Sequence, residues 1–481
     1  MSTLVVDVGT SGLRAAVVDG EGVVHALEYR PFPPSSPFPG LVEFDGAAMA
    51  NAILDVATRS LAAAGPVAAV GITNQRASTL LWDRETGEPI APGLGWQDLR
   101  TVFDCITAKA EHGLALAPNQ SATKVAWLLN NVAGARDRDL CFGTVDSWVA
   151  WVLSRGAVHV TDPSNAAVTG LLTADSKSWS VEACAALDVP MQILPSVIDS
   201  TGVFGEASAL PGAPPLAAII GDQQGSLVGQ GCVRPGLAKI TFGTGGMLDV
   251  CVGPTGPRSA QRSANGTFPI VAWSRDGERT WGAEAIMLSA GTNIEWLRDD
   301  LGIIDSAADS HDVAAQCDHT DGVVYVPALM GLGTPYWDYG ARGTLLGLTR
   351  GSGRPQLVRA VLEGIAHRGA DLLEAAEADF GSSIAAIRID GGMSQNPTFV
   401  QALANATGRA IEISRETEAT TIGAAYLAGL AVGVWGSFDD IAAAWRPRSV
   451  VEPTGRLDRP QWVAAVVRAR GWIPDLSALD F

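Results

Sequence analysis

Positive charge is scarce in this sequence. The 481 residues include 33 Lys and Arg against 51 Asp and Glu, which gives a formal net charge of −18 at pH 7. No block of Lys or Arg stands out along the chain. Proteins that bind nucleic acid or an anionic membrane surface usually carry such a basic region. The composition therefore argues against both kinds of partner, and any phosphate-binding site must be local.

Long apolar runs and clustered cysteines are also missing. The longest weakly polar run, residues 422–436, is shorter than the roughly 18 residues that a membrane-spanning helix needs, and it predicts a buried helix. The N-terminus lacks a basic region followed by an apolar stretch, so no signal peptide is expected. Scattered cysteines without metal-ligand spacing predict a reduced, cytoplasmic protein. They stand at positions 105, 141, 184, 232, 251 and 317.

The length and the pattern of the chain predict two α/β domains. A single hydrophobic core usually stops growing well below 481 residues. Strand-like segments alternate with Ala-rich and Leu-rich helical patterns, which is typical of α/β layering. Glycine turns follow strand-like segments at 4–19, 238–250 and 387–396, and their similarity indicates an internal duplication. We expect one domain over residues 1–230, a second over 231–481, and a cleft between them.

The first glycine turn has two open interpretations. It reads "LVVDVGTSGLRAAVVD", with Gly9 and Gly12 between two valine-rich runs, so an ordinary hairpin explains it. The same turn carries Thr10, Ser11 and Arg14. Backbone N–H groups, hydroxyls and a guanidinium that converge in this way form an anion site.

Polar side chains follow two further predicted strands. Asp222 comes directly after "APPLAAIIG", where it serves as a helix N-cap, as a functional carboxylate, or as both. Asn74, Gln75 and Arg76 come directly after "VAAVGIT", and open α/β sheets bind ligands at the carboxyl ends of their strands. Trp96 lies in a segment rich in hydrogen-bonding residues, which suits a small hydroxylated ligand, although ordinary core packing explains a tryptophan equally well.

Taken together, the motifs of the chain resemble those of one protein family. The order of the motifs is similar to that of the FGGY carbohydrate kinases, and most of all to the glycerol kinase branch, over about residues 4–436. The motifs are "DVGTSGLR", "GITNQR", "WQDLRT", "SATKVAWLL", "GTVDSWVAW", "VHVTDPSNA", "GDQQGSLVGQ", "FGTGGM", "GLGTPYWD", "ARGTLLGLTRG", "DGGMSQN" and "ETEATTIGAAYLAGLAVG".

The resemblance implies a fold and a nucleotide site. It implies two duplicated domains of the actin, Hsp70 and sugar kinase type, which is ribonuclease H-like, around a cleft where ATP and substrate meet. By position in the motifs, Asp7 would hold Mg²⁺ through water. Glu295 stands where glycerol kinases often have Gln, so this contact departs from the family pattern. The resemblance implies ATP contacts at Thr10, Ser11, Gly12, Arg14, Thr244, Gly291, Glu295, Gly392 and Asn396.

The resemblance also implies a substrate site with Asp222 as the general base. Arg76, Trp96 and Gln223 match further glycerol-contacting positions. Glycerol kinases usually read "GITNQRETT" and "DPYFSATK", whereas this chain reads "GITNQRAST" and "APNQSATK". Ala77 thus replaces a carboxylate and Asn119 replaces a tyrosine at the substrate-contacting positions, so the pocket is expected to be larger.

The leading hypothesis is an ATP-dependent kinase of a small polyol or sugar, with four or five carbons rather than the three of glycerol. Glycerol kinase proper is the alternative. A non-catalytic sugar-sensing regulator is less favoured, because Asp222 is present and no helix-turn-helix pattern is visible. A dinucleotide-dependent oxidoreductase lacks its G-x-G-x-x-G signature after the first strand. We expect no nucleic acid or membrane partner, and a homodimer or homotetramer.

Overall fold

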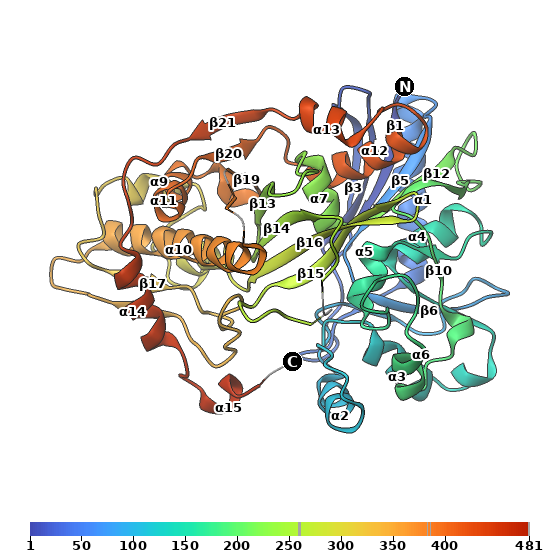
Figure 1. The fold of residues 1–481 in the computed structure, drawn as a ribbon, viewed down its shortest axis with the longest axis horizontal. Coiled ribbons are helices and arrows are strands. Elements are labelled where there is room, and N and C mark those ends of the chain that lie inside the picture. Colours follow the sequence, from blue (N-terminus) through green and yellow to red (C-terminus); the bar gives the residue numbers. More distant parts are fainter. Residues whose placement is uncertain (258–260, 382, 385, 480–481) are drawn as a thin grey trace.

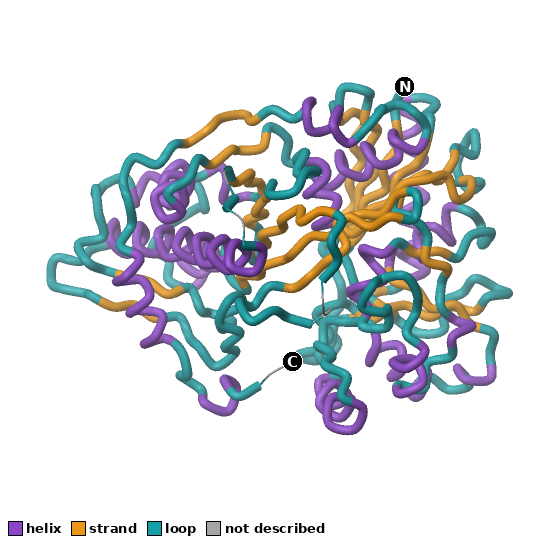
Figure 2. The backbone as a smooth tube through the Cα atoms, in the orientation of Figure 1, coloured by secondary structure: helices purple, strands orange, loops and turns teal. Residues whose placement is uncertain are grey.

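Two large mixed β-sheets form the framework of the molecule. The computed structural model describes residues 1–257, 261–381, 383–384 and 386–479. Figure 1 shows blue strands of the N-terminal half beside green and yellow strands of the C-terminal half. In Figure 2 the strands occupy the middle of the molecule and most helices lie around them. The expected α/β class is confirmed.

The first sheet comes from the N-terminal half and has the strand order β11-β12-β5-β1-β2-β3. Strands β1, β2 and β3 are antiparallel neighbours, while β5 and β12 run parallel to β1. The bounds are β1 (Thr3–Val8), β2 (Gly12–Val18), β3 (Val24–Pro31), β5 (Ala69–Asn74), β11 (Thr201–Glu206) and β12 (Pro215–Gly221).

The second sheet repeats this arrangement. Its order is β15-β16-β14-β13-β19-β20-β21, with β13, β14 and β16 antiparallel and β19 and β20 parallel to β13. The duplication is therefore confirmed, but the third glycine turn follows β19, the counterpart of β5, and is not a third copy of the hairpin. The bounds are β13 (Ala238–Phe242), β14 (Gly246–Gly253), β15 (Phe268–Arg275), β16 (Glu278–Met287), β19 (Ile387–Asp390), β20 (Ile411–Ser414) and β21 (Pro447–Val451).

Smaller elements extend each half. In the N-terminal half a four-stranded sheet has the order β4-β7-β6-β8. Its strands are β4 (Glu43–Phe44), β6 (Thr79–Asp83), β7 (Gly93–Leu94) and β8 (Leu140–Thr144), and two-stranded sheets pair β9 (Val160–Thr161) with β10 (Ser196–Val197) and β17 (Val324–Val326) with β18 (Thr344–Leu346).

Helices cover the sheets and bury their apolar faces. The N-terminal half contains α1 (Gly46–Ala64), α2 (Val102–His112), α3 (Ala122–Asn131), α4 (Val145–Leu153), α5 (Pro163–Ala166), α6 (Val181–Ala186) and α7 (Asp222–Gly229). The C-terminal half contains α8 (Thr292–Glu295), α9 (Asp309–Ala314), α10 (Arg354–Phe380), α11 (Pro397–Thr407), α12 (Ala419–Ala431), α13 (Phe438–Ala444), α14 (Arg459–Ala469) and α15 (Pro474–Ser477). In the described part of the chain no helix is long and apolar enough to cross a membrane.

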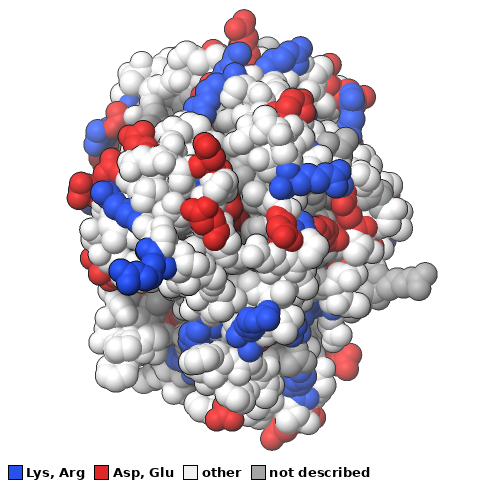
Figure 3. Space-filling model, turned by 90° about the vertical axis from the view of Figure 1, so that its left-hand side faces the viewer, with Lys and Arg blue, Asp and Glu red and all other residues white. Residues whose placement is uncertain are grey.

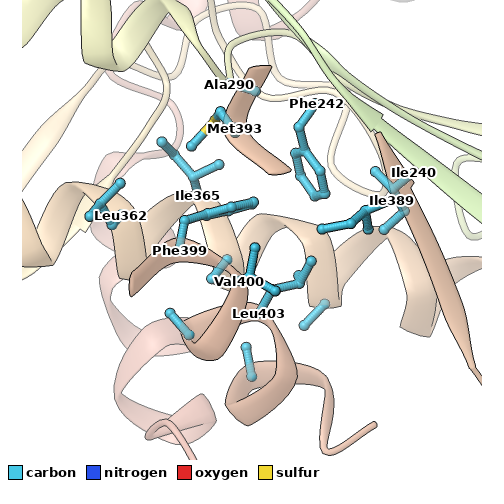
Figure 4. Packing of buried hydrophobic residues seen from close by; sticks show 14 of the residues in the cluster. Ile240, Phe242, Ala290, Leu362, Ile365, Ile389, Met393, Phe399, Val400 and Leu403 are labelled. Carbon is cyan, nitrogen blue, oxygen red and sulfur yellow. The ribbon is translucent and has the colours of Figure 1, made fainter. Parts of the chain in front are cut away.

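The core of the second half lies between its sheet and the helices α10 and α11. Figure 4 shows Phe242 of β13 pointing toward Phe399 of α11, with Ile389 of β19 beside them. The rings of Phe242 and Phe399 meet edge to face, with centroids 4.8 Å apart. Aromatic pairs favour this geometry because the positive edge of one ring faces the negative face of the other. The strand that leads into the second glycine turn is thereby held rigidly.

The two halves meet through helices that cross between them. Although α12 belongs to the C-terminal half, it packs on β1, β5 and β12 of the first sheet, and Figure 1 shows it beside β1 and β5. In return, α7 contacts β14 and β15 of the second sheet. The expected buried helix at 422–436 is confirmed, but it begins earlier and ends earlier, at Ala419–Ala431. The domain boundary at residue 230 stays a prediction.

Two local expectations are settled by the structure. Asp222 is the first residue of α7, and Gly221 occupies the N-cap position without a side-chain hydrogen bond. The N-cap interpretation of Asp222 is therefore wrong, and its carboxylate is left for other partners. All six cysteines are free, as the scattered spacing predicted. On the face in Figure 3, Lys and Arg are interspersed with Asp, Glu and uncharged residues.

The crossing of α7 and α12 depends on glycines that let two backbones touch. A Cβ at Gly229 would lie 1.9 Å from the carbonyl oxygen of Ala419, and one at Gly423 would lie 1.8 Å from that of Gly225. Real Cβ atoms never come so close to a backbone, so either addition forces the two helices apart. Among the described glycines, these two would bring a Cβ closest to another atom.

Replacing Gly229 with Ala is therefore expected to lower the free energy of unfolding by roughly 1–3 kcal/mol or more, because the added methyl overpacks the crossing. Urea or thermal unfolding of the full chain measures it. Gly351→Ala is the control, since a Cβ there meets only the Thr349 hydroxyl at 3.6 Å, and its effect should stay within about 0.5 kcal/mol. Equal stabilities of the two variants would contradict the argument.

Candidate active site

Three predicted site residues lie at the same edge of the first sheet. Asp7 of β1 pairs in register with Thr73 of β5, and Gly221 at the end of β12 pairs with Asn74. These three strands are parallel, so the segments that follow them emerge together. Arg76 and Asp222, which come just after the strands, are thereby placed beside Asp7.

Charged side chains from both halves meet at this edge. The Nη2 atom of Arg76 lies 2.6 Å from Oε2 of Glu284, and its Nε atom lies 3.5 Å from Oδ1 of Asp222. Nearby, Nζ of Lys239 lies 2.7 Å from Oδ2 of Asp249, and neither of these side chains is exposed. Two positive and three negative groups leave one negative charge in excess.

Asp222 has the properties of a proton acceptor. Burial raises the pKa of its carboxyl above the ordinary value, while Arg76 and the backbone N–H of Gln223 act in the opposite direction. That N–H donates to Oδ1 of Asp222 over 2.8 Å. The side chain keeps 30% of its surface exposed, against 12% for Arg76. A ligand can thus reach the carboxylate from solvent.

Arg76 has a donor that no protein group uses. Its Nη1 atom is buried and has no hydrogen-bond partner among the described residues. A buried donor without a partner costs about 1–3 kcal/mol, so such an atom in a native structure points to a missing acceptor. Its pKa lies above the ordinary arginine value because Glu284 and Asp222 outweigh the effect of burial, so the group stays charged.

Trp96 is held at the site by its backbone and its indole. Its Nε1–H donates to Oγ1 of Thr10 over 3.2 Å, and its backbone N–H donates to Oγ of Ser78 over 3.0 Å. Its carbonyl oxygen accepts from Nζ of Lys124 over 3.1 Å. The ring is only half-buried and belongs to none of the apolar clusters. The core-packing interpretation is therefore wrong.

The first glycine turn is a hairpin, and its polar groups face the neighbouring carboxylates. The N–H of Gly9 donates to the carbonyl of Gly12 over 2.9 Å, which closes the turn between β1 and β2. Arg14 pairs with Glu418, and its Nε lies 3.6 Å from Oδ2 of Asp7. The hairpin interpretation is thus confirmed, while phosphate binding by the same turn stays a prediction.

Asp7 is a buried carboxylate close to two other negative charges. Burial raises its pKa from 3.8 to about 6; the Arg14 guanidinium opposes this shift, while the negative charges of Asp222 and Glu418 add to it. The Thr421 hydroxyl of α12 donates to it over 3.3 Å. A cation beside Asp7 would relieve this repulsion. Mg²⁺ is commonly held by one or two carboxylates, with water completing its shell.

The expected nucleotide residues of the second half lie around one loop. The N–H of Gly291 donates to the carbonyl of Gly243 over 2.8 Å, and that of Ala290 donates to the carbonyl of Thr244 over 2.8 Å. Asp390, at the end of β19, pairs with Thr241 of β13, so Gly392 follows at the same edge. Thr244 and Gly392 are both exposed.

Three other residues expected at the site lie outside this loop. Asn396 caps α11 by accepting from the N–H of Phe399 over 3.0 Å, and it donates to Oγ of Ser310 over 2.8 Å. Glu295 is exposed at the end of α8. Asn119 is exposed in the loop before α3, and the described residues give its side chain no hydrogen bond to the rest of the site.

Sequence reasoning missed several residues of the site. Glu284, Lys239 and Asp249 come from separate strands of the second half, and Glu418 comes from the start of α12. The available signal was a single charge inside an apolar strand, as in "AKITF" and "GMLDVCVG". A buried charge needs a partner, so each one predicts an interaction, but not which one. Among the described residues no cluster of three His, Cys, Asp or Glu could hold a metal.

Comparisons with known proteins match both halves of the chain. Residues 2–229 match the FGGY family of carbohydrate kinases, N-terminal domain, and residues 238–432 match its C-terminal domain. A glycerol kinase of Aromatoleum aromaticum is 42% identical over 494 residues, covering 98% of this chain and 99% of the relative. A glycerol kinase of Deinococcus radiodurans is 42% identical over 500 residues, covering 99% of each chain.

Solved structures share the fold over the whole chain. The structure of Plasmodium falciparum glycerol kinase with ADP has a TM-score of 0.90 at 26% identity and covers 100% of this chain and 99% of that one. A xylulose kinase of Lactobacillus acidophilus has a TM-score of 0.83 at 21% identity, covering 97% and 96%. The expected two-domain sugar kinase fold is confirmed. The chain therefore belongs to the FGGY family of carbohydrate kinases, and it transfers a phosphoryl group from ATP to an alcohol group.

Proposed function

We propose that this kinase phosphorylates a small polyol or sugar of four or five carbons, with Asp222 as the general base. The observation that carries the proposal is the pair of Arg76 and Asp222. The unpartnered Nη1 donor of Arg76 lies on a guanidinium whose Nε is 3.5 Å from the half-exposed Asp222 carboxylate. A hydroxyl group can accept from the guanidinium and donate to the carboxylate at the same time.

The proposed proton path is short. The hydroxyl oxygen of the substrate forms a bond to the γ-phosphorus of ATP, the bond from that phosphorus to the β–γ bridging oxygen breaks, and ADP leaves. The hydroxyl proton passes to the Asp222 carboxylate. Positioning and charge neutralisation supply most of the rate in phosphoryl transfer, and a general base typically adds about 10²- to 10⁴-fold. Arg76 keeps the substrate oxygen next to the base.

Both glycine turns are proposed to bind the nucleotide phosphates. In the first turn, the guanidinium of Arg14 is paired with Glu418, which a phosphate oxygen would replace as acceptor. Glycines let backbone N–H groups approach the phosphate oxygens without a Cβ in the way. The proposed ATP contacts are Thr10, Ser11, Gly12, Arg14, Thr244, Gly291, Glu295, Gly392 and Asn396.

Asp7 is proposed to hold Mg²⁺, and the residues around it fit such an ion. When bound, the ion supplies positive charge to the phosphate oxygens. Asp7 lies near Asp222 and Glu418, whose charges raise its pKa, while Arg14 and the Thr421 hydroxyl oppose them. This excess of negative charge is what a divalent cation compensates.

The substrate size is argued from Ala77 and its neighbours. Ala77 is buried, and its carbonyl oxygen accepts from Oγ of Ser121 over 2.9 Å. The start of α3, two residues after Asn119, thus contacts the backbone of Ala77. Losing a carboxylate that accepts from a substrate hydroxyl removes roughly 1.5–3 kcal/mol, which is about tenfold to a hundredfold in affinity. Glycerol remains the second candidate, because the curated relatives named above are glycerol kinases.

The cellular setting is proposed on composition alone. The six free cysteines favour the reducing cytoplasm. A homodimer or homotetramer stays a prediction.

The general base is tested by Asp222→Asn. The change removes the proton acceptor at nearly constant volume, so turnover is expected to fall by about 10²- to 10⁴-fold while the Kd for ATP stays close to that of the unchanged chain. ADP release and calorimetric titration with ATP measure the two quantities. Asp439→Asn, at an exposed position, is the control. Near wild-type turnover in Asp222→Asn would eliminate the proposed base.

The substrate class is tested with a panel of glycerol, tetritols, pentitols and ketopentoses. We expect kcat/KM to be highest for a compound of four or five carbons. Ala77→Glu should shift the preference toward glycerol by roughly tenfold or more, because it restores an acceptor carboxylate. Ala77 already has a φ of 63°, so the longer side chain meets no new backbone requirement. Ala77→Gln is the matched neutral control. A higher kcat/KM for glycerol than for the whole panel would make this a divergent glycerol kinase.

The cost of the buried Asp7 charge is tested by Asp7→Asn. The folded-state pKa is about 6 against an ordinary 3.8, so folding is penalised once the carboxyl ionises. The penalty is absent below the ordinary pKa, grows as pH rises between these values, and is complete above about pH 6. At pH 8 the variant should therefore be more stable by roughly 1–3 kcal/mol, with no difference near pH 3.5.

Urea unfolding of the nucleotide-free chain at both pH values measures this difference. Turnover should fall in the same variant, because the proposed Mg²⁺ ligand is lost. A variant that is less stable at pH 8 would show that the Asp7–Arg14 pair outweighs the burial cost.

A further inference from the structure

We infer that Lys239 is a positioning residue that determines which way the amide of Gln223 faces, and thereby which substrate groups the site accepts. The inference rests on the proposed function, in which Gln223 contacts the substrate. Nothing in the family resemblance or the comparisons assigns this role to Lys239. It follows from the contacts of one ammonium group at the junction of the two halves.

The Lys239 ammonium group has three polar neighbours and no exposure to solvent. Its Nζ atom donates to Oε1 of Gln223 over 2.8 Å and to Oγ1 of Thr241 over 3.0 Å. It lies 2.7 Å from Oδ2 of Asp249, and the side chains of Lys239 and Asp249 are both 0% exposed. An ammonium group has three donors and no acceptor; Lys239 donates to Gln223 and Thr241 and forms a close ion pair with Asp249.

This geometry decides the orientation of the Gln223 amide. The oxygen and nitrogen of an amide are usually assigned from their hydrogen-bond partners. If the amide were flipped, its NH₂ group would face the ammonium hydrogens and two donors would oppose each other without water. The oxygen must therefore face Lys239, and the NH₂ group faces away from it. Gln223 is half-buried, and within the described residues its Nε2 atom has no hydrogen-bond partner.

Asp249 compensates the buried positive charge of Lys239. Lys239 and Asp249 are directly opposite residues of the antiparallel strands β13 and β14, and Asp249 is in turn opposite Glu284 of β16. Three charged residues thus form a row across the second sheet, next to Arg76 and Asp222 of the first half. The pair of Lys239 and Asp249 is neutral as a whole. It can therefore orient Gln223 without changing the net charge at the base.

The consequence is a selectivity rule. An NH₂ group that faces the substrate donates a hydrogen bond, so the substrate must offer an acceptor at that point. A hydroxyl or a carbonyl oxygen fits, whereas an ammonium group, which only donates, does not. Without Lys239 the amide is free to turn and can meet either kind of group.

The test is an amino scan of the preferred polyol. At each carbon that is not phosphorylated, the hydroxyl is replaced by an amino group, and kcat/KM is measured for each analogue near pH 7, where alkylamines are protonated. In the unchanged chain we expect one position at which the amino group lowers kcat/KM by about tenfold or more. In K239M/D249L, which removes both buried charges together, that penalty should shrink to about threefold or less, while penalties at other positions persist.

A matched control removes another partly buried ion pair of the second half. Arg359 and Glu363 of α10 lie 3.3 Å apart with side chains 18% and 16% exposed, and neither contacts the site residues. R359M/E363L should leave the whole scan unchanged. Thermal unfolding of each variant establishes that it is folded.

A second variant keeps the test decisive if K239M/D249L does not fold. In Gln223→Glu, one carboxylate oxygen accepts from Lys239 and the other faces the substrate as an acceptor. The preference at the same position should then move toward the amino analogue by about tenfold. This reversal identifies Gln223 as the side chain that contacts the sensitive position. K239Q/D249N then tests Lys239: a neutral amide at position 239 can donate or accept, so the Gln223 amide is free to turn and the amino penalty of the unchanged chain should shrink to about threefold or less.

The outcomes separate the two proposals. If KM rises for every analogue in K239M/D249L while the penalty at the sensitive position is unchanged, Lys239 only stabilises the fold and the inference is overturned. The inference is also overturned if Gln223→Glu leaves the amino penalty as it was. If the unchanged chain phosphorylates no polyol or sugar, the proposed substrate class fails, and this inference fails with it.

Discussion

The contact between α7 and α12 is the constraint on which the rest of the structure depends. Two helices from different halves touch backbone to backbone at Gly225, Gly229 and Gly423. Both helices begin at the site, because Asp222 is the first residue of α7 and Glu418 precedes α12. Since rigid helices carry a displacement along their whole length, fixing the crossing fixes the position of Asp222 relative to Glu418. The glycines at the crossing therefore set the relative positions of charged groups at the site.

The site itself is built from charges that neither half could bury alone. Arg76 belongs to the first half, but its closest partner, Glu284, comes from the second. The ion pair of Lys239 and Asp249 lies in the second half, yet it contacts Gln223 of α7. Burying an ion is costly unless it is paired with an opposite charge. Arg76 of the first half therefore depends on a carboxylate from the second half. The resulting network of five side chains keeps one negative charge in excess.

Much of the fold and part of the site were predictable from the sequence. The alternation of strand-like and helical patterns predicted an α/β protein, and the repeated glycine turns predicted an internal duplication. Both signals can be read from short stretches of sequence, because strand and helix periodicity and glycine turns are local properties. The motif resemblance predicted the kinase family, which the comparisons confirm. Polar residues after apolar strands, such as Arg76 and Asp222, were predicted to face a ligand, because parallel strands end at a common edge.

Only the tertiary structure decided which charged groups of the site pair with each other. The partner of a buried charge can lie hundreds of residues away in the sequence, so no local pattern identifies it. Nothing local to Lys239 indicates that its ammonium group meets Gln223 and Asp249, or that Arg76 pairs with Glu284 more than two hundred residues away. The local rule also failed at Asp222, where Gly221 occupies the N-cap position and the Asp222 carboxylate does not cap the helix. The sequence by itself determined the family, the layering and the types of group at the site. Only the fold decided how those groups pair, because burial, proximity and the direction of an amide depend on the two halves packing against each other.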